Sequence, residues 1–174
     1  SLFFIGTHHK ERVADIRAFY QAAKQLGLPI DFRIAAKNLD QARAELGLTD
    51  IQYLPYQDAL PYRENLLLTQ KAGVLVDFLN TKHYGLSLRI FEAIGFEKKL
   101  ITTNPTIVHY DFYHPDNILV WTGNNHAELI EFLKKPYFRL PQHIKHKYSF
   151  ENWISYVFNI EPNTPITLPN LANP

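Results

Sequence analysis

The sequence predicts one doubly wound α/β domain: a Rossmann-like parallel sheet of about six strands with helices on both faces. Two observations predict it. Short apolar runs alternate along the chain with segments whose apolar residues recur at helical spacing. Residues 74–79 form a nearly continuous apolar run, which suits a strand buried on both faces of a parallel sheet.

The first half of the chain is predicted to alternate strand, helix, strand, helix, strand. The strands are residues 2–5, 30–35 and 51–54, and the helices are residues 13–26 and 39–46. Val13, Ile16 and Phe19 recur at spacings of three and give the first helix an apolar stripe. Gly27 and Gly47 follow the two helices, as glycines at helix C-termini do. This order favours a parallel sheet.

The second half continues the alternation after a loop rich in proline and tyrosine. The predicted helices are residues 62–71, 85–97 and 126–134, and the strands are residues 74–79, 99–102 and 117–121. We assign residues 1–148 to the Rossmann-like, nucleotide-sugar-binding domain and residues 149–174 to an amphipathic helix with an extended, proline-rich tail. Phe150, Trp153 and Val157 lie on the apolar side of that helix.

Composition excludes several classes of protein. With 46% apolar and 20% charged residues, the chain has the balance of a globular protein. A net charge of +1 argues against a nucleic-acid-binding domain, which usually carries a basic face. The absence of cysteine excludes a disulfide framework and a thiolate nucleophile, and it is compatible with the cytoplasm. No apolar run approaches the roughly 18 residues of a membrane-spanning helix.

The start of the chain indicates that a longer protein precedes it. Ser1 leads at once into an apolar run, without the basic flank of a signal peptide, and the sequence contains no methionine. We therefore expect a fragment, or a processed form, whose N-terminal part is missing.

Two loops are predicted to lie at the ligand-binding edge of the sheet. In an open parallel sheet, ligands bind outside the carboxyl ends of the strands, near the point where the strand order reverses. The loops after residues 2–6 and after residues 74–79 have these positions. The second leads into a helix whose first backbone N–H groups would attract phosphate. There Gly85 would allow close approach of a ligand, and Ser87 offers a hydroxyl.

Arg89 and Glu92 are the candidate ligand-binding side chains of this helix. They share one helical face with Gly85, at spacings of four and seven residues, while Leu86 and Ile90 share another. Arg89 could hold phosphate oxygens in a fork geometry, and Glu92 could accept hydrogen bonds from ribose hydroxyls. The alternative is that the two residues form a weak ion pair on the surface.

The segment GLSLRIFEAIGFEKKLITTN, from Gly85 to Asn104, resembles the signature of the C-terminal domain of GT-B glycosyltransferases. It is most similar to bacterial lipopolysaccharide and capsular polysaccharide glycosyltransferases, in which a tyrosine- and aspartate-rich segment like residues 110–113 follows. The family has two glutamates separated by seven residues, and the second binds the ribose of the donor. Glu92 matches the second glutamate. Tyr84 replaces the first, so the stereochemical outcome cannot be assigned.

The resemblance implies further contacts to the donor. Gly6, Thr7 and Lys10 would approach the diphosphate from the first loop, where the alternative is an ordinary polar turn. Tyr56 follows the third strand and would contact the base, where the alternative is plain packing. Residues 102–104 would line the same cleft. The residues that begin the signature helix complete the expected donor site: Tyr84, Gly85, Leu86 and Ser87.

These observations predict a hexosyltransferase-like glycosyltransferase domain. It would bind a nucleotide-diphosphate sugar for transfer to a cell-surface polysaccharide or a lipid-linked acceptor. We expect it to be inactive without the N-terminal acceptor domain. No metal or other cofactor is expected, because the resemblance implies none and the histidines are scattered. The alternatives are a GT-B nucleotide-sugar epimerase of the non-hydrolysing type and a non-catalytic α/β binding module.

A basic stretch near the C-terminus suggests where such an enzyme would act. Five cations lie close to Tyr137 and Phe138, and this combination could rest on an anionic membrane surface. That contact would suit a cytoplasmic enzyme at the inner face of the membrane, and the alternative is ordinary solvated charge. The cations are Lys134, Lys135, Arg139, Lys145 and Lys147.

Overall fold

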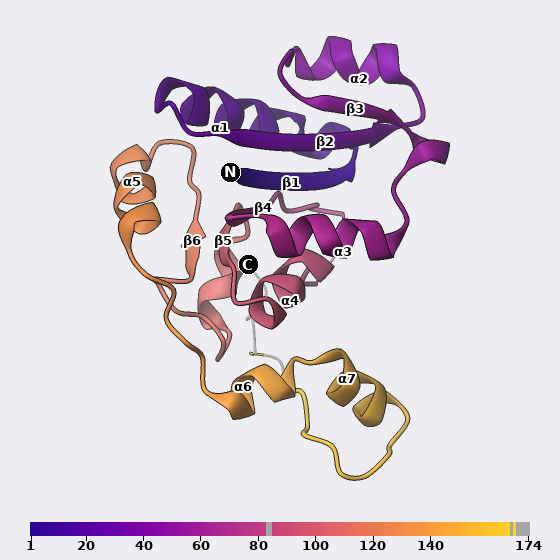
Figure 1. Ribbon diagram of the computed structural model, residues 1–174, viewed down its shortest axis with the longest axis vertical. Coiled ribbons are helices and arrows are strands. Elements are labelled where there is room, and N and C mark those ends of the chain that lie inside the picture. The colour runs from indigo at the N-terminus through magenta and orange to yellow at the C-terminus, as the bar shows by residue number, and fades with distance from the viewer. Residues whose placement is uncertain (83–84, 168, 170–174) are drawn as a thin grey trace.

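The sheet has the strand order β3-β2-β1-β4-β5-β6, and every neighbouring pair is parallel. This all-parallel order confirms the doubly wound α/β prediction. A computed structural model describes residues 1–82, 85–167 and 169 (Figure 1). The strands are β1 (Leu2–Thr7), β2 (Ile30–Ala36), β3 (Gln52–Pro55), β4 (Val74–Asp77), β5 (Lys99–Thr102) and β6 (Ile118–Val120).

Helices cover both faces of the sheet. One face packs against α1, α2 and α5, and the other packs against α3 and α4. The helices are α1 (Val13–Gln25), α2 (Leu39–Leu46), α3 (Tyr62–Lys71), α4 (Leu88–Gly95), α5 (His126–Lys134), α6 (Gln142–Lys147) and α7 (Phe150–Val157). Short 3₁₀ segments are η1 (Lys10–Arg12), η2 (Tyr56–Asp58) and η3 (Pro105–His109).

Strands β1, β4 and β5 consist mainly of apolar residues because both faces of the sheet are buried there. In β1, Leu2 and Phe4 point into the core beneath α1, while Phe3 points into the core beneath α4. All three side chains are almost completely buried. The same alternation in β4 sends Leu75 to one core and Val76 to the other.

The strand order reverses between β1 and β4. The chain moves outward from β1 through β2 to β3, and then returns to the other side of β1 as β4. The carboxyl ends of these two neighbours are Thr7 and Asp77. The loops that leave them therefore flank the topological switch point, where open α/β sheets bind ligands.

The start of α4 differs from the prediction. The helix begins at Leu88 rather than at Gly85, because Ser87 is extended, with ψ 155°. Gly85 has φ +153°, a conformation that residues with a side chain rarely adopt. Gly85 therefore precedes the helix, and the prediction that it shares the helical face of Arg89 and Glu92 is wrong. Tyr84 lies outside the described residues.

The C-terminal part contains a short helix, α6, that was not predicted, followed by α7. Ser149 caps α7, where its hydroxyl oxygen accepts a hydrogen bond from the Asn152 backbone N–H at 3.1 Å. Residues 161–167 have no regular structure, although Ile166 packs against the core beneath α4. The domain boundary at residue 148 stays a prediction.

Candidate functional site

The centre of the switch point is the buried carboxylate of Asp77. Its Oδ1 accepts a hydrogen bond from the Ser87 hydroxyl at 2.7 Å, and its Oδ2 accepts one from the Thr102 hydroxyl at 3.1 Å. Burial raises the pKa of Asp77, and these hydrogen bonds and the charges of Arg12 and Arg89 oppose that rise. Asp77 therefore joins the ends of β4 and β5 to the start of α4.

Arg89 and Glu92 form an ion pair beside this carboxylate. Arg89 Nη1 lies 2.5 Å from Glu92 Oε2 and 2.5 Å from the Thr69 hydroxyl, and Nη2 donates a longer bond of 3.4 Å to the Ile5 carbonyl oxygen. Their side chains are only 12% and 9% exposed. The predicted common helical face is thus confirmed, but the pair is buried between α3, α4 and β1 rather than lying on the surface.

Burial acts in opposite directions on the two partners. It lowers the pKa of Arg89 and raises the pKa of Glu92, and in each case the charge of the other partner counteracts the shift. Among the described residues, no hydrogen bond reaches the second carboxylate oxygen of Glu92, Oε1. Arg89 therefore engages only one of the two carboxylate oxygens of Glu92.

Arg12 brings a second guanidinium to the crevice, from η1 after β1. Its Nη2 donates a 2.5 Å hydrogen bond to the Thr7 carbonyl oxygen, and Asp77 is a charge partner. Its Nε is shielded from solvent and has no hydrogen-bond partner within the described part of the chain. Burial lowers the pKa of Arg12, and Asp77 opposes that shift. Sequence reasoning missed this residue.

Gly6 makes room for the Phe4 ring. A methyl group at Gly6 would lie 3.0 Å from that ring and 3.7 Å from Arg12 Nη1, and the second distance is an ordinary contact. A larger residue would therefore have to displace the ring. This close approach explains a glycine in β1, and the role of Gly6 in donor binding stays a prediction.

The other predicted residues of the first loop make contacts of their own. The Thr7 hydroxyl lies 2.9 Å from His9 Nε2. Lys10 is 71% exposed and lies 3.8 Å from Glu45, a distant and solvated pair. An ion pair of 2.5 Å between Lys82 and Glu11 joins this loop to the loop after β4. The two loops that flank the switch point are thus bridged directly.

The remaining predicted residues differ in their relation to Asp77, and the Thr103 N–H donates to the Asp77 carbonyl oxygen at 3.2 Å. Leu86 is partly buried and packs against the core beneath α4. Thr103 accepts a hydrogen bond from the Leu79 N–H, and Asn104 caps η3. Tyr56 follows β3, two strands away from β1, and it is half exposed with the Lys37 ammonium 5.8 Å from the ring centroid. The structure therefore brings Thr102 into the crevice but not Tyr56.

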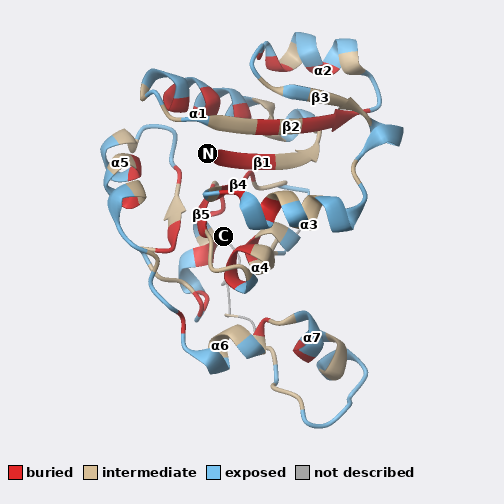
Figure 2. Ribbon diagram, viewed as in Figure 1, coloured by how far each residue is buried: buried red, intermediate tan, exposed pale blue. Residues whose placement is uncertain are grey.

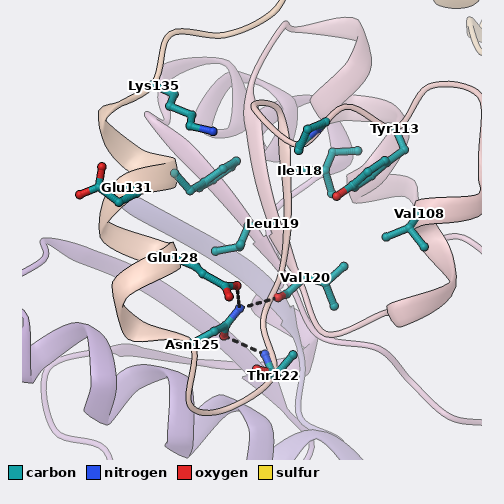
Figure 3. A pocket seen from close by; sticks show the side chains of 12 residues that line it. Val108, Tyr113, Ile118, Leu119, Val120, Thr122, Asn125, Glu128, Glu131 and Lys135 are labelled. Carbon is teal, nitrogen blue, oxygen red and sulfur yellow. Dashed lines mark hydrogen bonds between the residues drawn. The ribbon is translucent and has the colours of Figure 1, made fainter.

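A groove of about 450 Å³ lies elsewhere, on the open edge of β6 (Figure 3). It is flanked by α5 on one side and by Val108 and Tyr113 on the other. Asn125 braces one end, where it donates to the Val120 carbonyl oxygen and accepts from the Thr122 N–H. Since β5 separates β6 from β4, this groove is not the predicted donor site.

Comparison of the chain with protein-family models and with curated protein sequences gives no match. The resemblance to glycosyltransferases therefore depends on the residues of the chain alone. Within the described ranges, no helix is long and apolar enough to cross a membrane. In the same residues, no cluster of three or more histidine, aspartate or glutamate side chains has a metal-binding arrangement.

Proposed function

We propose that the crevice at the switch point binds the diphosphate and ribose of a nucleotide sugar, as the donor domain of a glycosyltransferase. One observation carries the proposal. The N-terminus of α4, the Arg89–Glu92 pair and Arg12 converge where the strand order reverses, which is where doubly wound sheets bind nucleotides.

The start of α4 is suited to an anion. The Ser87 side chain donates to Asp77 instead of capping the helix, and no other described residue supplies a side-chain acceptor to the first N–H groups of α4. Such groups and the helix dipole stabilise phosphate.

Each side chain would have a distinct role. The Arg12 guanidinium would contribute positive charge beside a phosphate, and Glu92 Oε1 would accept from a ribose hydroxyl while Oε2 stays on Arg89. The main role of Arg89 would then be to hold Glu92 in position, not to contact a phosphate. During transfer the leaving diphosphate gains charge, and donors fixed around it would stabilise that charge.

The acceptor and the catalytic base are assigned to the preceding domain that the resemblance implies. This chain alone is therefore expected to bind the donor and to transfer nothing.

The proposal is tested by thermal unfolding in the presence of UDP, GDP, CMP, ADP and their common sugar conjugates, with NAD as the control ligand. A ligand that binds only the folded chain adds about 2.7 kcal/mol of stability at a hundred times its dissociation constant. We expect one nucleoside diphosphate to raise the melting temperature. Glu92→Gln and Glu92→Ala should remove the effect, and Glu128→Gln, on the distant β6 groove, should retain it.

A non-catalytic α/β module is the second candidate, and a specific observation favours it. Arg89 and Glu92 form a buried ion pair, as a purely structural pair would. This candidate predicts no stabilisation by any nucleotide, and it predicts that Glu92→Gln changes only the stability. If a nucleotide does bind, analysis of the products made by the full two-domain enzyme separates a transferase from an epimerase.

A further inference from the structure

The apolar side of α7 faces solvent rather than the core. Phe150 is 75% exposed, Trp153 is 49% exposed and Phe158, directly after the helix, is 68% exposed. The Phe150 and Trp153 rings stack on each other with centroids 5.8 Å apart. The amphipathic helix predicted from the sequence is confirmed, but its apolar side points away from the domain.

The polar side of α7 is the one fixed to the protein. Asn152 is 1% exposed and donates hydrogen bonds of 2.9 Å to the carbonyl oxygens of Lys147 and Thr164. In return, the Thr164 N–H donates to Asn152 Oδ1 at 2.7 Å. Figure 2 shows α7 beyond α6, at a distance from the sheet, with only a short part of the helix buried. The outward direction of the apolar side therefore follows from hydrogen bonds that hold the opposite side.

The exposed surface is large for a single chain. Aromatic side chains present about 150–250 Å² each, so the partly exposed residues of this patch leave roughly 600 Å² of apolar surface in solvent. That is the upper end of what monomers usually show, about 300–600 Å². The patch consists of Phe150, Trp153, Tyr156, Val157, Phe158 and Ile160.

We propose that this α7 patch is a self-association surface, which pairs with the same patch of a second copy of the chain. Two such patches would bury about 1,200 Å² in total, the lower limit of a specific protein interface. Phe150, Trp153 and Val157 recur at spacings of three and four, so they form one stripe that can pack against its own copy across a two-fold axis. Aromatic anchors of this kind dominate the energy of interfaces. The proposal is independent of nucleotide binding.

The charges near the patch favour a protein partner over a lipid surface. Glu151 and Glu161 are the only charged residues in the segment 149–161, and both are acidic. The lysines of α6 form ion pairs, Lys145 with Glu97 at 2.9 Å and Lys147 with Asp111 at 2.6 Å. Binding to anionic bilayers usually requires cations beside the inserted aromatic residues. This segment lacks that arrangement.

The test is sedimentation equilibrium of the chain over a range of micromolar concentrations. We expect a reversible dimer. Phe150→Ser and Trp153→Ser should each weaken it by about tenfold or more, as loss of an interface anchor does. Leu67→Ser on α3 is the matched control, since Leu67 is also half exposed but lies outside the patch, and it should leave the dimer intact. Far-UV circular dichroism checks that each variant is folded.

Two outcomes overturn the proposal. A chain that is monomeric at every concentration has no self-association surface. A dimer that both serine variants leave unchanged uses another surface. Flotation with vesicles of phosphatidylcholine and phosphatidylglycerol adds a separate arm: a monomer that floats, and loses this property in Trp153→Ser, would assign the α7 patch to lipid instead.

Discussion

The Ser87 hydroxyl donates a hydrogen bond to Asp77 Oδ1 across 2.7 Å, although ten residues separate the two in the chain. Serine at this position usually caps its own helix. Here its side chain is turned to β4, so Ser87 does not cap the first N–H groups of α4. One hydrogen bond thus ties a buried carboxylate at the switch point to the start of α4.

Asp77→Asn should stabilise the chain near neutral pH. An unfolded aspartate titrates near 3.9, and burial raises the pKa of Asp77 in the folded chain. Between these two pKa values the folded chain binds more protons than the unfolded chain, so the free energy of unfolding falls as pH rises. The amide keeps the shape of the carboxyl but does not titrate, so the variant lacks this decrease in the free energy of unfolding with rising pH. Urea unfolding from pH 3 to pH 8 should show a gain for the variant on the order of 1 kcal/mol at neutral pH that disappears in acid.

Asp111→Asn is the control, because its pH dependence should have the opposite sign. Burial acts to raise the pKa of Asp111, but hydrogen bonds from Lys147 and Tyr148 outweigh burial and lower it. The stability that Asp111 contributes is present above its unfolded pKa and is lost as pH falls through the folded pKa. The variant should therefore be less stable than the natural chain at neutral pH and similar to it in acid. If both substitutions changed the free energy of unfolding at neutral pH in the same direction, the result would contradict the burial of Asp77.

Removal of one charge of the Arg89–Glu92 pair should lower the free energy of unfolding more than removal of both charges. Arg89→Met leaves Glu92 buried without its cation, and breaking a buried pair in this way costs about 3–5 kcal/mol. With Glu92→Gln added, no unpaired charge remains, and we expect at least about 1 kcal/mol to be recovered. A double-mutant cycle by urea unfolding measures this coupling. Strictly additive effects would mean that the two side chains do not depend on each other.

The strands were predictable because both of their faces are buried. Continuous apolar runs located each strand to within two residues of its observed ends. Helix α6 was missed because Ile144 is its only apolar residue, so no helical stripe exists in residues 142–147. The start of α4 was placed too early because Ser87 could equally be read as a residue of the first turn, and only its extended backbone shows otherwise.

The candidate site was only partly predictable. Arg89 and Glu92 are close in the chain, so helical spacing could bring them together. Arg12 and Asp77 come within electrostatic range of each other through the reversal of strand order, and no local pattern in the sequence predicts this proximity. The amphipathic pattern of α7 likewise predicted an apolar side, but the direction of that side depends on the hydrogen bonds of Asn152 with Thr164.

Two glycines should respond in opposite ways to alanine. Gly47 ends α2 with φ +63°, and its N–H donates to the Arg43 carbonyl oxygen at 2.8 Å. Gly47→Ala should lose about 1 kcal/mol, because the left-handed conformation is costly for residues with a Cβ. Gly95 lies in α4 with no atom within 4 Å of an added methyl group, so Gly95→Ala should gain up to about 1 kcal/mol. Thermal unfolding measures the stability of both variants. A loss of stability in Gly95→Ala would mean that the surroundings of Gly95 leave no room for a methyl group.

Arg12 and Lys10 should contribute unequally to nucleotide binding if the proposed function is right. Arg12 lies near Asp77 at the switch point, and a hydrogen bond from its guanidinium to a charged phosphate would contribute about 1.5–3 kcal/mol. Arg12→Met should therefore weaken binding of the stabilising nucleotide by at least about tenfold in calorimetric titration. Lys10 is mostly exposed, so Lys10→Met should change the affinity by less than about threefold.

If Lys10→Met weakened nucleotide binding more than Arg12→Met, the phosphates would contact Lys10 in the exposed part of the first loop rather than Arg12. This part of the loop lies beside the Lys82–Glu11 ion pair. Binding would then weaken steeply with added salt, because exposed charges are screened over about 8–10 Å. Charges shielded in the crevice are screened less, so the proposed geometry predicts a shallow salt dependence for the natural chain. Titration of the two variants at low and high ionic strength therefore locates the phosphates relative to Arg12.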